Sequence, residues 1–110
     1  MVIDQVSLPA LCDDKGFLAD RSQWTTAIAE AFAAEEKVQL TDAHWEILYL
    51  LRDYYENYDA SPANRALVNF VKKRLGPEKG NSIYLLTLFP VSPARVGSRI
   101  AGLPKPKNCL

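Results

Sequence analysis

The sequence has few of the residues that cross-link, metallate or anchor small proteins. Its 110 residues include 2 cysteines, Cys12 and Cys109, which are too few for a disulfide framework, and no Cys-x-x-Cys pair or Cys/His cluster offers a zinc site. No stretch approaches the roughly 18 consecutive apolar residues of a membrane span, and no basic segment followed by an apolar run opens the chain. We therefore expect one compact cytoplasmic domain without a cofactor, a metal or a membrane contact.

Acidic and basic residues are unevenly distributed, although the net charge is zero. Residues 1–60 hold 4 Lys or Arg against 12 Asp or Glu, a net charge of −8, and residues 61–110 hold 9 against 1, a net charge of +8. The asymmetry can attract an anionic partner, or it can serve only for pairing between the two halves. A small helical nucleic-acid-binding regulator is thus an alternative function. No recognition-helix motif supports it, so direct nucleic-acid binding is not expected.

The pattern of apolar residues predicts a mainly helical (α+β) domain over residues 1–101. Short apolar stretches on either side of a polar turn at 13–16 predict a β-hairpin over about residues 1–19. Helical periodicity and cap residues predict five helices: one over 23–36, one capped by Thr41 and running to about Asn57, one capped at Ser61-Pro62 and stopped by Gly76, one opened by 80–82 and ended by Pro90, and one from Ser92-Pro93 to about Ala101. Connections of two to five residues favour a compact cluster of these helices.

The composition changes in the last nine residues, 102–110, which read GLPKPKNCL. Gly102 relaxes the backbone, while Pro104 and Pro106 fix φ and favour an extended course. We expect a flexible C-terminal arm over 102–110 that carries Cys109 close to its tip, where a side chain gains little from packing.

A cysteine in this position is either reactive or without a role. Lys105 and Lys107 would favour the thiolate of Cys109, whereas the terminal carboxylate opposes it, so the direction of the pKa shift stays open. A thiolate can accept the outer sulfur of a donor persulfide and surrender it to the next thiol. Arg95 and Arg99, four residues apart on the last helix, could steady an anionic persulfide or carboxylate.

The other conspicuous side chains have simpler interpretations. His44 lies in the first turn of a predicted helix, without a nearby cysteine or paired carboxylate, which favours a packing or capping role. The large aromatic residues occur at helical spacing, which predicts that they supply core area; they are Trp24, Trp45, Tyr54, Tyr55 and Tyr58.

The tail GLPKPKNCL resembles the C-terminal signature of the TusE/DsrC sulfur-relay family. The resemblance continues upstream through HWE at 44–46, RDYY at 52–55, SPA at 61–63 and EKGNS at 78–82, and it covers nearly the whole chain. It implies a small helical fold with an N-terminal hairpin and a mobile arm, and it implies that Cys109 bears the persulfide.

The resemblance also separates two branches of the family. Members resembling DsrC, the partners of dissimilatory sulfite reductase, carry a second cysteine eleven positions before the penultimate one, and this chain has Ser98 there. A hydroxyl cannot form a disulfide or trisulfide, so the pattern is similar to the single-cysteine TusE branch. That branch implies a persulfide-carrying sulfurtransferase with a TusBCD-like donor and an MnmA-like acceptor that makes wobble 2-thiouridine in bound tRNA. A DsrC-like partner of sulfite reductase remains the alternative.

Overall fold

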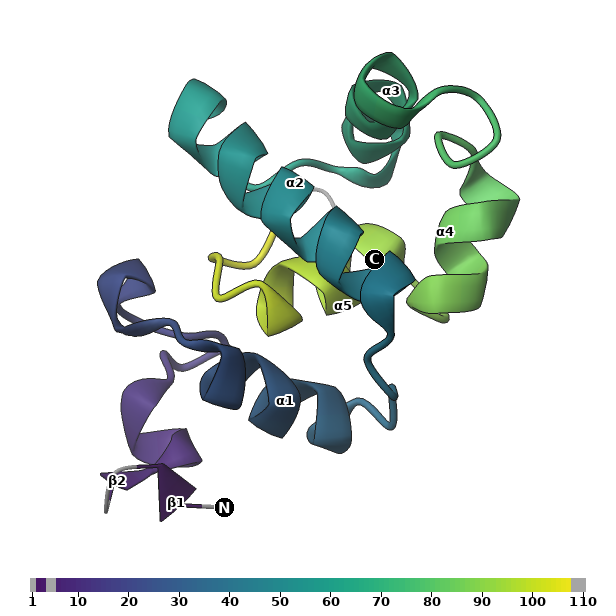
Figure 1. Ribbon diagram of the computed structural model, residues 1–110. Helices are drawn as coiled ribbons and strands as arrows, with labels where there is room; N and C mark the ends of the chain where they lie inside the picture. The colour runs from purple at the N-terminus through teal and green to yellow at the C-terminus, as the bar shows by residue number, and fades with distance from the viewer. Residues whose placement is uncertain (1, 4–5, 108–110) are drawn as a thin grey trace.

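Helix α5 (Pro93–Ile100) contacts each of the other helices in the computed structural model, which describes residues 2–3 and 6–107. The neighbours are α1 (Thr26–Glu35), α2 (Asp42–Tyr58), α3 (Asn64–Leu75) and α4 (Ser82–Leu88), arranged around α5 as Figure 1 shows. Gly97 allows α5 to pack closely on α2, because a Cβ at Gly97 would stand only 2.9 Å from Leu51 Cδ1. The segment that follows α5 therefore leaves the centre of the structure.

The N-terminal region contains two antiparallel pairings, and the one that spans the predicted turn at 13–16 is a single bridge rather than a pair of strands. Strands β1 (Val2–Ile3) and β2 (Val6–Ser7) pair antiparallel, and a 3₁₀ turn at Leu8–Leu11 follows. The polar turn at 13–16 then brings Cys12 and Leu18 into an antiparallel bridge. Asp13 shapes that turn, because its Oδ1 accepts from the backbone N–H groups of Lys15 and Phe17.

The caps of four helices follow the predicted pattern. The N–H of Thr41 donates to Nδ1 of His44 at the start of α2, and the side chains of Asn81 and Ser92 accept from the first turns of α4 and α5. Gly76 ends α3 at φ +92°. Hydrogen-bonding side chains and glycine thus fix these boundaries locally, which is why sequence predicts them.

Two predicted helix starts were wrong. Helix α1 begins at Thr26 rather than at residue 23, because Trp24 is extended and Thr25 is the cap that accepts from the N–H of Ile28. A short 3₁₀ turn, Arg21–Gln23, precedes it. Helix α3 has Ala63 at its N-cap without a side-chain cap, because the hydroxyl of Ser61 bonds elsewhere, to the carbonyl of Pro104.

The core is one apolar cluster that the five helices share. Its largest fully buried side chains come from every helix and from the tail, and they include Phe32, Ile47, Leu51, Leu67, Phe89, Ile100 and Leu103. Within the residues that the structure describes, no helix has the length and apolar character to cross a membrane.

Candidate functional site at the root of the tail

The described part of the tail packs on the domain. Residues 108–110, and with them Cys109, lie outside the described residues, so the candidate site is built from Gly102 to Lys107. Leu103 is fully buried, and its N–H donates to Ser98 O at 2.9 Å. Pro106 is buried as well, whereas Lys105 and Lys107 are exposed. A flexible arm over 102–110 remains a prediction, and the structure places its first residues against the helices.

Two side chains from distant parts of the sequence hold the end of α5. The indole N–H of Trp24 donates to Ile100 O at 2.9 Å, and Nη1 of Arg52 donates to Ala101 O at 2.7 Å. The guanidinium of Arg52 also lies 4.2 Å from the Trp24 ring centroid. These bonds satisfy carbonyls that the end of a helix otherwise leaves unpaired. They also fix the direction in which the tail departs.

Close packing at Gly102 and a bond to Pro104 complete this arrangement. Gly102 has φ +75°, and a Cβ there would stand 2.3 Å from Cδ1 of Trp24. Two residues later, the hydroxyl of Ser61 donates to Pro104 O at 2.6 Å. We call Trp24, Arg52, Ser61 and Gly102 the arm clamp. Of these four residues the sequence predicts only Gly102 at the site, and it predicts Trp24 in a helix and Ser61 as a helix cap.

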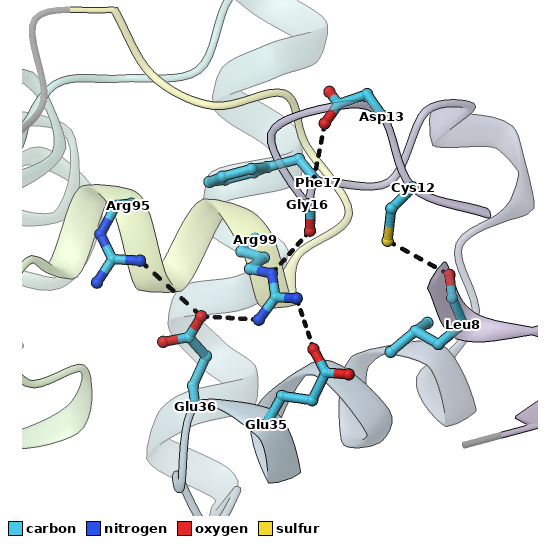
Figure 2. A network of polar contacts seen from close by, with 9 residues as sticks. All are labelled: Leu8, Cys12, Asp13, Gly16, Phe17, Glu35, Glu36, Arg95 and Arg99. Carbon is cyan, nitrogen blue, oxygen red and sulfur yellow. Dashed lines mark hydrogen bonds and ion pairs between the residues drawn. The ribbon is translucent and has the colours of Figure 1, made fainter. Parts of the chain in front are cut away.

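Arg99 and Arg95 point toward α1, as Figure 2 shows. Arg99 donates from Nε to Gly16 O at 2.8 Å, from Nη1 to Glu36 at 2.8 Å and from Nη2 to Glu35 at 2.5 Å. Burial opposes the charged form, yet these carboxylate bonds raise the pKa of Arg99 overall. Arg95 reaches Glu36 at 3.9 Å. The two arginines thus join α5 to the end of α1, and a role in steadying an anion on Cys109 stays a prediction.

His44 has the capping role that its position predicts. Its Nδ1 accepts from the N–H of Thr41 at 3.1 Å, so Nε2 carries the ring proton and donates to Leu88 O at 2.8 Å. The ring is buried and packs edge-on against Phe89. Both ring nitrogens of His44 therefore form hydrogen bonds within the domain.

Cys12 lies on the N-terminal bridge, half-buried, with its thiol donating to Leu8 O at 3.4 Å (Figure 2). Burial raises its pKa, and Glu35 and Asp13 raise it further against the opposing effect of Arg99. We expect iodoacetamide to alkylate Cys12 in a Cys109→Ser chain more slowly at neutral pH than it alkylates free cysteine, because the thiolate is the nucleophile. The rate should rise as the pH rises. A neutral-pH rate equal to that of free cysteine would contradict this expectation.

Ser98 occupies the position where the resemblance places a second cysteine in DsrC-type proteins. It is fully buried, and within the described part of the chain its hydroxyl has no hydrogen-bond partner. We expect Ser98→Ala to raise the free energy of unfolding by about 1 kcal/mol, because an unpaired buried hydroxyl is destabilising. Urea unfolding midpoints at constant m-value measure this. Ser92→Ala is the matched control, and it should lower stability by about 1 kcal/mol through loss of the α5 cap. A loss of stability in Ser98→Ala would show that its hydroxyl is paired.

The described residues hold no group of three or more His, Cys, Asp or Glu that could bind a metal ion. The tail itself has two exposed lysines, Lys105 and Lys107, which precede Cys109 in the sequence.

Comparisons with known proteins agree on one family. The model of DsrC-like proteins matches residues 7–110, a range that includes Cys109. A protein named "Sulfurtransferase TusE homolog" from Haemophilus influenzae is 49% identical over 89% of this chain and 90% of its own length. Sulfurtransferase TusE of Photorhabdus laumondii is 45% identical over 89% of this chain and 88% of its own length.

Solved structures give the same result for the fold. DsrC of Allochromatium vinosum superimposes with a TM-score of 0.85 at 42% identity, covering 100% of this chain and 96% of that one. The oxidised γ-subunit of dissimilatory sulfite reductase (DsrC) from Archaeoglobus fulgidus gives 0.74 at 41% identity, covering 90% of each chain. The chain belongs to the DsrC-like family. Its kinship with the TusE proteins makes it, within that family, a sulfurtransferase of a sulfur relay.

Proposed function

We propose that the protein carries sulfur as a persulfide on Cys109, between a TusBCD-like donor complex and an MnmA-like enzyme that thiolates the wobble uridine of tRNA. The observation that carries the proposal is the identity of 45–49% to proteins named sulfurtransferase TusE, over 89% of the chain. The match of the family model through residue 110 supports Cys109 as the sulfur-bearing residue. Ser98 supports the single-thiol branch.

The proposed chemistry is two thiol exchanges without a net redox change. The Cys109 thiolate attacks the outer sulfur of the donor persulfide, the donor S–S bond breaks, and the donor leaves as a thiolate. Cys109 then holds the persulfide. The acceptor's thiolate attacks the outer sulfur in turn, and the Cys109 thiolate leaves. Because each bond formed replaces an equivalent bond, neither step needs an oxidant or a reductant.

The test is to load the whole chain from a persulfide donor and to locate the added sulfur. Intact mass should show one added sulfur atom, and peptide mapping should place it in the fragment that contains Cys109. Incubation with a purified MnmA-type enzyme, tRNA and ATP should then remove the sulfur and produce 2-thiouridine. An added sulfur that maps to Cys12 would refute the assignment of the thiol. A loaded carrier that gives no thiouridine would refute this acceptor.

The structural neighbours favour one second candidate, a partner of dissimilatory sulfite reductase. One neighbour is named as a γ-subunit of that reductase, at 41% identity. Ser98 argues against the two-thiol cycle, because a hydroxyl cannot close the disulfide. Co-purification of the tagged chain with a sulfite reductase would favour this candidate, and its absence from such a complex would count against it.

A further inference from the structure

Two open hollows meet on the face formed by α2, α3 and the tail. One, of about 460 Å³, is lined by residues that include Asn57, Tyr58, Asn69 and Lys73. The other, of about 510 Å³, is lined by residues that include Asp59, Lys105 and Lys107. Tyr54 and Ala66 line both, so the two hollows lie next to each other. We call them together the α2–α3 groove.

Three aromatic rings that contact one another line this groove. Tyr54 lies 4.5 Å from Tyr58 and 5.2 Å from Phe70, measured between ring centroids, and the contact with Phe70 is edge-to-face. Phe70 is buried, whereas Tyr58 is 60% exposed. The rings therefore hold one another in place and leave Tyr58 open to solvent. A flat aromatic ring held in this way can stack on an unpaired base at little cost in conformational entropy.

The groove is also basic. Lys73, Arg74, Lys105 and Lys107 line it, against one carboxylate, Asp59. Arg74 is paired with Asp53 at 2.6 Å, but among the residues that the structure describes none of the three lysines has a carboxylate partner. Basic side chains thus line both hollows. That charge is complementary to a chain of phosphates.

We propose that the α2–α3 groove binds the unpaired loop of the tRNA that contains the wobble uridine. The inference rests on the proposed function, which places that loop at the acceptor's active site, and Lys107 precedes Cys109 by only two residues. Stacking on Tyr58 requires an unstacked base, which a loop offers and a duplex does not. The lysines hold the phosphates, and the amides of Asn57 and Asn69 present donors and acceptors to base edges. Lys105 and Lys107 of the tail are part of the binding surface.

The test measures binding of the full chain to a fluorescent RNA stem-loop that contains the wobble uridine, and to a duplex made from the same stem. The loop should bind more tightly than the duplex, with an affinity that falls as salt rises. Tyr58→Ala should weaken loop binding by about tenfold or more. Lys73→Gln and Lys105→Gln should each weaken binding and reduce its salt dependence.

Matched controls use the same residue types on other surfaces. Tyr84, partly exposed on α4, lines neither hollow, so Tyr84→Ala should leave the RNA affinity of the folded chain unchanged. Lys37→Gln serves in the same way for the lysines, since Lys37 lines a separate hollow. Equal losses in Tyr58→Ala and Tyr84→Ala would overturn the proposal, as would equal affinity for loop and duplex, or no binding of the loop at low salt.

Two further measurements distinguish RNA binding by the groove from protein binding by the groove and from a failure of the proposed function. If the groove variants lose affinity for the acceptor enzyme without tRNA but keep their affinity for RNA, the groove binds protein and the RNA proposal is refuted. Sulfur loading of Cys109 is followed in every variant. Wild-type chain that does not load refutes the proposed function, whereas normal loading with no loop binding refutes only the groove.

Discussion

A chain with serine in place of Cys109 is expected to lose sulfur transfer completely. A serine hydroxyl is not ionised at neutral pH and forms no persulfide, so neither exchange can begin. Fold stability should not change measurably, because serine differs from cysteine by a single atom of similar size. The measurement is the content of wobble 2-thiouridine in tRNA from cells whose own copy of the gene carries Cys109→Ser. It should fall to the level seen when the gene is deleted.

The matched control for this loss is the other cysteine. Cys12→Ser should retain full thiolation, because the Cys12 thiol is half-buried, hydrogen-bonded to Leu8 O and has a raised pKa. Normal thiouridine in Cys109→Ser cells would refute the tRNA pathway for this chain. A loss in Cys12→Ser cells with folded protein would instead show that a second thiol takes part in the relay.

The helical fold could be predicted from sequence because its signals are local. Thr41, Asn81, Ser92 and Gly76 each act within one helical turn of where they stand, and the structure confirms all four boundaries. The predictions failed where a side chain bonds far along the chain. Trp24 and Ser61 bind carbonyls 76 and 43 residues away, and nothing in their own sequence neighbourhoods shows this.

The residues of the candidate site also differ in how far the sequence predicts their surroundings. Cys109 and the residues around it are contiguous in the sequence, and the family model's match over residues 7–110 includes them. Arg95 and Arg99 were placed correctly on one helix, but spacing on a helix does not tell which element packs against it. Their partners, Glu35 and Glu36, come from α1. Helical spacing also predicts that Tyr58 supplies core area, but Tyr58 lies in the last turn of α2 and is 60% exposed.

Gly102→Ala is expected to uncouple the tail from the domain. An alanine at φ +75° costs about 1–2 kcal/mol, and its Cβ would overlap the Trp24 ring at 2.3 Å, which adds about 1–3 kcal/mol. Because the three atoms nearest to that Cβ all belong to the Trp24 side chain, the indole must move, and it then loses its hydrogen bond to Ile100 O and its contact with Arg52. Loading from a small persulfide donor should be unchanged. Transfer to the acceptor enzyme should fall about tenfold or more, because a misdirected thiol loses its orientation toward the partner.

Two other glycines separate this effect from a loss of stability. Gly16→Ala has the same backbone strain at φ +85°, but its Cβ meets nothing closer than Arg99 Nη2 at 3.9 Å. Gly80→Ala has the overlap without the positive φ, since its Cβ would stand 2.2 Å from Cα of Lys72. Both should lower the unfolding midpoint, and both should transfer sulfur normally per folded molecule. If Gly80→Ala, at equal loss of stability, slows transfer as much as Gly102→Ala does, the clamp does not direct the tail. Slow transfer in Gly102→Ala alone would show that the domain fixes the direction of the thiol.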